Sequence, residues 1–119
     1  MKIIDRVFAW ILVVGGLLHG FGSFHMYAKE PMTLLWSLCA TLLTLLIAAI
    51  NLLRVARHSD RPLVWISFAG SLSWAVAAFA AGVLIHNIFD PRPMTHWVTA
   101  LVLAGFSLKA VLEAGSVKA

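Results

Sequence analysis

Histidine is the residue type in this chain best suited to chemistry, and three histidines fall on faces of apolar segments that should pack inward. They are His19, His86 and His96, each on a different segment. An ionisable side chain inside a membrane span indicates a functional site, because it is costly to place there. Neutral imidazole binds zinc and copper, and imidazoles on facing helices can hold a haem. These three side chains are therefore the predicted cofactor-binding or metal-binding residues.

His25 is a weaker fourth candidate. It lies six residues beyond His19, which turns it about 120° away around a helix and brings it close to the expected helix end. The chain contains no HExxH, CxxC or CxxCH sequence. The sequence therefore assigns no catalytic residue and leaves open whether the protein is an enzyme.

The histidines must be positioned by four apolar runs that fill most of the 119 residues, of which 61% are hydrophobic and 12% charged. A bilayer core about 30 Å thick is crossed by roughly 20 helical residues. The sequence predicts a single all-α transmembrane domain over residues 1–119, an integral membrane four-helix bundle in up-down-up-down order, in contact with the lipid bilayer. The expected helices cover residues 7–27, 31–53, 62–89 and 93–114.

Prolines mark the starts of the last three expected helices. Pro31, Pro62 and Pro93 suit the first helical turn, where a backbone N–H has no partner within the helix. Asp60, just before Pro62, is a candidate N-cap for the third helix.

Positive charge predicts the orientation of the bundle. Two of the nine Lys and Arg residues, Lys29 and Arg92, lie on one side. The other seven lie on the opposite side, which should be cytoplasmic: Lys2, Arg6, Arg54, Arg57, Arg61, Lys109 and Lys118. Both termini are therefore expected inside, with the bacterial inner (plasma) membrane as the expected location. Because the basic residues sit at helix ends and form no continuous face, nucleic acid is not an expected partner.

Small residues predict which helix faces point inward, because they let helix backbones approach within a membrane. On three of the four expected helices the predicted stripe leads to one of the three histidines. The stripe of the second helix contains no histidine; it consists of Thr33, Ser37, Ala40, Thr41, Thr44, Ala48 and Asn51. His19 lies within a stripe of Gly15, Gly16, Gly22 and Ser23. His86 is the next step beyond Ser71, Ala75, Ala78 and Gly82. His96 precedes Thr99, Ala100, Ala104 and Ser107. We therefore expect the three rings to converge in the outer third of the bundle.

Three functions remain open at this point. The first is binding of haem b or of a transition metal such as zinc or copper, for electron transfer or metal handling. The second is an accessory or structural subunit without its own chemistry, in a homo-oligomer or a larger membrane complex. The third is a small transporter. In size alone the chain resembles the small multidrug resistance exporters, which implies a glutamate within the first helix. Here no carboxylate lies between Asp5 and Glu30.

Overall fold

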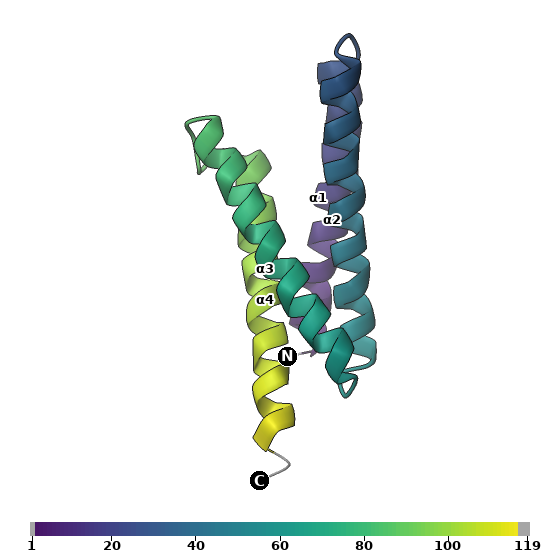
Figure 1. Cartoon of the computed structure of the whole chain (residues 1–119), viewed down its shortest axis with the longest axis vertical. Helices are drawn as coiled ribbons and strands as arrows, with labels where there is room; N and C mark the ends of the chain where they lie inside the picture. The colour runs from purple at the N-terminus through teal and green to yellow at the C-terminus, as the bar shows by residue number, and fades with distance from the viewer. Residues whose placement is uncertain (1, 117–119) are drawn as a thin grey trace.

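Four helices joined by short loops make up the described part of the chain. The computed structural model describes residues 2–116, with side chains as far as Glu113; Lys118 of the predicted charge bias lies outside this range. The helices are α1 (Lys2–Tyr27), α2 (Pro31–Ala56), α3 (Arg61–Leu84) and α4 (Pro91–Ser116) (Figure 1). Each is long and apolar enough to cross a membrane. The chain is thus an all-α integral membrane protein.

Proline and aspartate define where the last three helices begin. Helix α2 begins at Pro31, and Pro62 is the second residue of α3. Helix α4 begins at Pro91, two residues before the predicted start. The carboxylate of Asp60 accepts a hydrogen bond from the backbone N–H of Leu63 at 3.2 Å. The carboxylate of Asp90 accepts one from the backbone N–H of Arg92 at 3.0 Å. Both carboxylates therefore cap first-turn N–H groups that have no partner within the helix.

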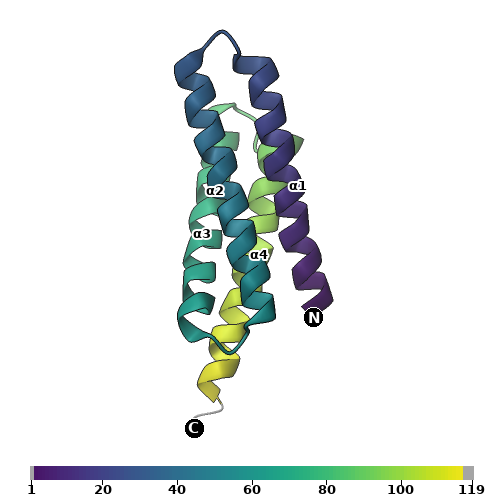
Figure 2. The ribbon, with the colours of Figure 1, turned by 90° about the vertical axis from the view of Figure 1, so that its right-hand side faces the viewer.

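The helices form two antiparallel hairpins, α1 with α2 and α3 with α4. Between the hairpins, α1 contacts α4 and α2 contacts α3. The hairpins lie together toward the end that holds both termini and diverge toward the other end (Figure 1), and the view turned by 90° shows one hairpin in front of the other (Figure 2). We call these the terminal end and the distal end. The distal end holds the loops at residues 28–30 and 85–90.

Helix α3 ends at Leu84, five residues before the predicted end at 89. His86 follows with φ 57°, the left-handed conformation usual for the residue just past a helix C-terminus. The N–H of Asn87 donates to the carbonyl of Gly82 at 2.9 Å, and the N–H of His86 donates to that of Val83 at 2.9 Å. These two bonds form a Schellman motif, which turns the chain away from the helix axis.

Large apolar side chains cover the outside of the bundle and contact lipid. Every helix contributes several exposed examples. They include Leu18 and Phe21 on α1, Leu42 and Leu46 on α2, Ile66 and Val76 on α3, and Leu101 and Leu112 on α4.

The predicted inward faces of α3 and α4 are confirmed. All eight of their predicted small residues are buried: Ser71, Ala75, Ala78, Gly82, Thr99, Ala100, Ala104 and Ser107. On α1, Gly16 and Ser23 are buried, whereas Gly15 and Gly22 are half-buried. Spacing by three and four residues thus identifies the packed faces, because the small residues lie where helices meet.

Glycines on α1 serve packing within the bundle. A Cβ added at Gly20 would lie 2.9 Å from Cγ2 of Thr41, and one added at Gly16 would lie 3.1 Å from Cγ2 of Thr44. Both threonines are on α2. Helices α1 and α2 therefore approach so closely at these positions that a methyl group would force a neighbour to move.

Candidate functional site

Two of the three predicted histidines meet, and they come from different hairpins. The ring centroids of His19 on α1 and His96 on α4 lie 5.9 Å apart, with an interplanar angle of 79°. His19 is half-buried and His96 is 8% exposed. The ring of His96 packs against α1 at Gly15, where an added Cβ would lie 3.5 Å from its Cε1. The approach of α4 to α1 at this depth thus encloses the imidazole of His96.

Serine hydroxyls from both helices of the first hairpin surround His19. Its Nε2 lies 3.1 Å from Oγ of Ser37 on α2. The hydroxyl of Ser23 donates to the backbone carbonyl of His19 at 2.7 Å and is also hydrogen-bonded to the hydroxyl of Ser37. These contacts hold the imidazole of His19 against α2. Each hydroxyl has one proton, so the hydroxyl of Ser37 donates to Ser23 and accepts from Nε2–H of His19.

His96 and Trp74 each keep an unsatisfied buried nitrogen. Nδ1 of His96 and the indole Nε1 of Trp74 find no hydrogen-bond partner among the described residues. The two rings lie edge to face, with centroids 5.9 Å apart. Buried polar atoms usually have a partner, and an exception requires an explanation. A bound ligand or an ordered water at this position would satisfy them.

His86 and His25 lie apart from this pair. His86 is exposed in the loop beyond α3. The helix ends at Leu84, so His86 does not share a helix face with Gly82, as the spacing of four residues had predicted. His25 is exposed, with its ring 4.5 Å from that of Phe21 and Nδ1 3.1 Å from the carbonyl of Phe21. Among residues 2–113, no group of three or more His, Cys, Asp or Glu side chains could hold a metal ion. Of the three predicted ligands, His19 and His96 are thus brought together and His86 lies apart from them.

A second buried polar site, which the sequence analysis missed, lies toward the terminal end. Arg54 in the last turn of α2 makes a bidentate ion pair with Asp5 in the first turn of α1, at 2.9 and 2.6 Å. The two side chains are 3% and 11% exposed. This pair joins the two ends of one hairpin through charge-assisted hydrogen bonds.

Hydrogen bonds extend the ion pair to the other hairpin. Nε of Arg54 donates to Oγ of Ser67 on α3, and the hydroxyl of Ser67 donates to Oδ1 of Asn51. Ser67 also contacts the hydroxyl of Ser107 on α4, at 3.1 Å, and Asn51 donates to Ser71 on α3 at 2.8 Å. We call Asp5, Asn51, Arg54, Ser67, Ser71 and Ser107 the polar clamp. It includes side chains from all four helices.

A signal for the polar clamp exists in the sequence. The inward stripe of α2 runs through Thr44, Ala48 and Asn51, and its next step of three lands on Arg54. We expected this arginine in a loop because the apolar run stops at residue 53. Helix α2 instead continues to Ala56, which keeps Arg54 on the inward face.

An apolar layer separates the polar clamp from the histidine pair. Its buried members are Ala9 and Leu12 on α1, Ile47 and Ala48 on α2, and Leu103 on α4. Along each of these helices the layer lies between residues of the clamp and residues around the histidines. The two polar sites are thus distinct features at different depths.

No protein-family model, curated protein or solved structure matches this chain. Its function is therefore inferred from its own side chains.

Proposed function

We propose that this protein binds a b-type haem between its two hairpins and transfers electrons within the membrane. One observation carries the proposal. The imidazole rings of His19 and His96 come from different hairpins, and their centroids lie 5.9 Å apart. A haem supplies its own equatorial ligands, so the protein needs to provide only axial ones. Zinc takes at least three protein ligands, which these two histidines do not supply.

His19 and His96 would be the residues that hold the iron, and a haem held there would supply one-electron transfer. His96 is already held between Trp74 and α1. His19 would have to turn its Nε2 from Ser37 toward the space between the hairpins. Ser37 and Ser23 would then be the groups that orient the ring.

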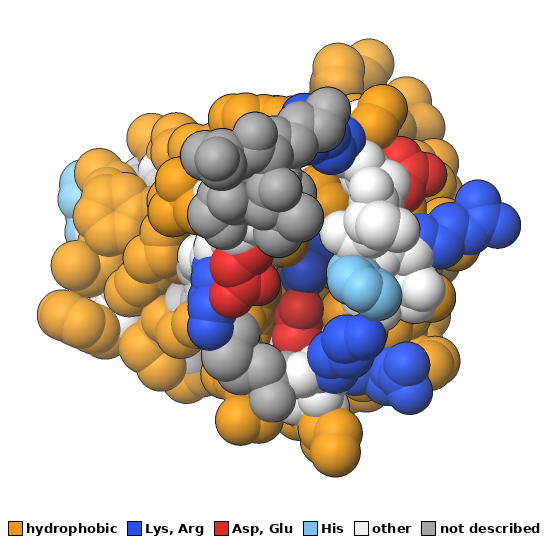
Figure 3. Space-filling model, turned by 90° about the horizontal axis from the view of Figure 1, so that it is seen from below, with side chains coloured by type: hydrophobic (Ala, Val, Ile, Leu, Met, Phe, Trp, Pro, Cys, Tyr) orange, Lys and Arg blue, Asp and Glu red, His pale blue; other side chains and the backbone are white. Residues whose placement is uncertain are grey.

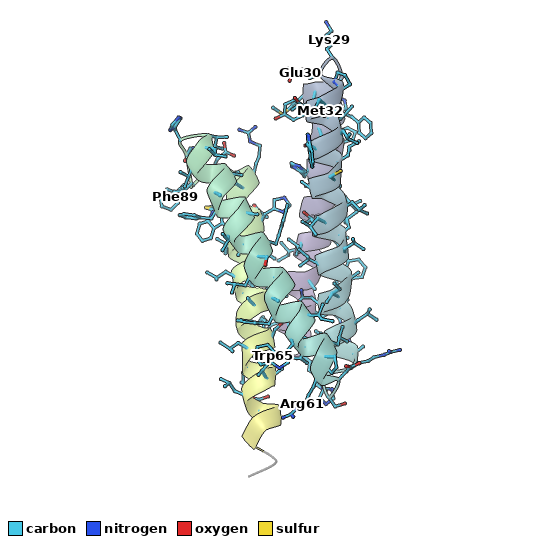
Figure 4. All side chains as sticks on the ribbon, viewed as in Figure 1. Lys29, Glu30, Met32, Arg61, Trp65 and Phe89 are labelled. Carbon is cyan, nitrogen blue, oxygen red and sulfur yellow. The ribbon has the colours of Figure 1, made fainter. Side chains whose placement is uncertain are left out.

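The two hairpins diverge toward the distal end (Figure 1). Figure 4 labels Lys29 and Glu30 at the tip of one hairpin and Phe89 at the tip of the other, well separated from each other. On the α1 side, Gly15 faces His96, and a Cβ at Gly22 would meet no described atom of another segment within 4 Å. The small residues of α1 therefore add little bulk on this side.

The absorption spectrum of the purified protein tests this proposal. We expect a Soret band and a stoichiometric amount of iron in the wild type. His19→Ala and His96→Ala should each lose most of the haem, because each removes one axial ligand. His86→Ala and His25→Ala are matched controls, since both rings lie outside the site, and they should keep it. A wild type without haem, or a His96→Ala variant with unchanged haem content, would contradict the proposal.

An accessory membrane subunit without its own chemistry is the second candidate. It is favoured by the bond between His19 and Ser37, which satisfies Nε2 of the imidazole within the protein. A protein that binds no haem or metal but copurifies with a larger membrane complex would support this alternative. The small-transporter hypothesis gains no support, because the carboxylate within α1, that of Asp5, is bound to Arg54.

We also propose that the terminal end is cytoplasmic, in the inner membrane of a bacterium. Six Lys and Arg residues described near this end support the orientation, against Lys29 and Arg92 near the distal end. The histidine pair would then lie in the outer half of the membrane. Labelling of single cysteines at residues 29 and 92 from the cytoplasmic side alone would contradict this orientation.

A further inference from the structure

A pocket of about 360 Å³ lies between the start of α3 and the end of α4, at the terminal end. His58 of the 57–60 loop and Arg61 at the start of α3 form its polar part. Trp65 lies one turn further along α3 (Figure 4). Residues 110–112 of α4 supply the opposite, apolar side. Along α3 the lining thus changes from cationic to aromatic with increasing depth in the membrane, and residues 110–112 form an apolar wall opposite the start of α3.

Exposure of these side chains matches a site at the membrane surface. His58 and Arg61 are exposed, and Trp65 is 53% exposed. Arginine with a tryptophan one turn deeper is suited to the boundary between phospholipid head groups and acyl chains. Residues 110–112 lie opposite the start of α3, nearer the terminal end than Ser107, which contacts Ser67. A phosphate group at Arg61 would therefore place the start of an acyl chain beside Trp65, one turn deeper on α3.

Two carboxylates close to the pocket in sequence already have partners. Asp60 accepts the backbone N–H of Leu63 at 3.2 Å, and Glu113 pairs with Lys109 at 3.6 Å. Figure 3, which looks onto the terminal end, shows Lys and Arg side chains on several sides of this face. The charge of the surface around the pocket favours an anionic ligand.

The same order of residues recurs on α1, at the same end of the molecule. A second pocket, of about 230 Å³, is lined by Lys2 and Arg6, with Trp10 one turn deeper. Two unconnected segments thus present basic residues above a tryptophan at the terminal end. This repetition is expected where a protein meets an anionic membrane surface.

We propose that the pocket between α3 and α4 binds the phosphate head group of an anionic phospholipid, with Arg61 and His58 at the head group and Trp65 beside the start of an acyl chain. The proposal is independent of haem binding, because the pocket lies at the opposite end of α4 from His96. It assigns the terminal end a specific lipid partner in addition to its general contact with the bilayer.

Lipid titration of the full-length protein in a neutral detergent tests this proposal. Dioleoylphosphatidylglycerol is added to one sample and dioleoylphosphatidylcholine to another, and bound lipid is counted by native mass spectrometry while Tm is recorded. We expect preferential binding of the anionic lipid. Arg61→Gln should weaken it about fivefold, since one basic side chain near an anionic surface contributes about 1 kcal/mol. His58→Gln is a second variant, in an exposed loop, and it should also weaken binding of the anionic lipid. This variant keeps the test valid if Arg61→Gln folds poorly.

Lys29→Gln is the matched control, because Lys29 is an exposed cation at the distal end. It should leave binding of the anionic lipid unchanged. Equal binding of the two lipids by the wild type would overturn the proposal, as would unchanged preference in both Arg61→Gln and His58→Gln. Inorganic phosphate alone should leave Tm unchanged. A rise equal to that caused by phosphatidylglycerol would instead indicate a site for free anions and overturn the lipid assignment.

Discussion

The imidazole of His96 is held on three sides by groups from two other helices. Trp74 of α3 lies edge to face with it, Gly15 of α1 lies beneath it, and His19 approaches from the same helix as Gly15. A ring packed in this way has few alternative rotamers, so its unsatisfied Nδ1 cannot readily turn toward solvent. An enclosed imidazole is better preorganised for a ligand than an exposed one.

His86 has a backbone role at the end of α3, in place of the ligand role predicted for it. Its φ of 57° is less favourable for a residue with a Cβ than for glycine. We expect His86→Gly to leave haem content unchanged and to raise stability by up to about 1 kcal/mol, measured by thermal unfolding in detergent. A loss of stability above that size, or loss of haem, would assign the imidazole a role that its exposed position does not explain.

The ion pair of Asp5 and Arg54 is the most buried charge pair described in the molecule. Removing one partner leaves the other charge buried without compensation, which typically costs about 3–5 kcal/mol, whereas replacing both partners costs much less. We expect Arg54→Leu to destabilise the protein by that amount and Asp5→Leu/Arg54→Leu to recover most of the loss.

An exposed ion pair provides the control for this prediction. Lys109 and Glu113 lie 3.6 Å apart and are 46% and 67% exposed. Lys109→Leu should therefore change the free energy of unfolding by less than about 1 kcal/mol. If the double variant at positions 5 and 54 were as unstable as the single one, the charge pair would not be the source of the loss.

Asp90 at the start of α4 gives the stability of the protein a dependence on pH. Hydrogen bonds from Arg92 lower the pKa of the Asp90 carboxyl from 3.8 to about 2. Because the folded state favours the charged form, this contribution is present above about pH 4 and is lost as the pH falls toward 2. The difference in Tm between wild type and Asp90→Asn should therefore shrink over that interval. A difference that stayed constant from pH 6 to pH 2 would contradict this account of the cap.

The number, order and inward faces of the helices could be predicted from the sequence, because apolar length and small-residue spacing are local properties. The end of α3 could not be predicted, because His86 occupies the position where glycine or asparagine usually marks a helix end. The polar clamp was missed because its pairing is not local. Asp5 and Arg54 are 49 residues apart, and charges near helix ends also fit a role in orientation alone.

Glycine positions on α1 offer a matched test of how the first hairpin packs. A Cβ at Gly20 would lie 2.9 Å from Cγ2 of Thr41, whose hydroxyl is bound to the carbonyl of Ser37. Rotation of this threonine would break that bond, so Gly20→Ala should destabilise the protein by about 1–3 kcal/mol. Gly22→Ala meets no described atom of another segment within 4 Å and should be neutral or slightly stabilising. Equal effects of the two variants in thermal unfolding would show that close packing is not the cause.

The molecule as a whole is held together at one end and divergent at the other. The polar clamp joins all four helices near the terminal end, an apolar layer follows, and the hairpins separate beyond it (Figure 1). The histidine pair lies on the distal side of the apolar layer. The spacing of small residues places His19 and His96 on inward faces. The relative position of the hairpins depends on contacts between distant segments, so it could not be deduced from spacing.

The most direct measurement of the central claim is the electron paramagnetic resonance spectrum of the oxidised, purified protein. Two axial imidazoles give low-spin ferric haem, and loss of one converts the iron to high spin or releases the haem. We predict a low-spin signal in the wild type that is absent from His96→Ala and unchanged in His86→Ala. A wild type without a haem signal, or a low-spin signal that survives in His96→Ala, would contradict the proposed site.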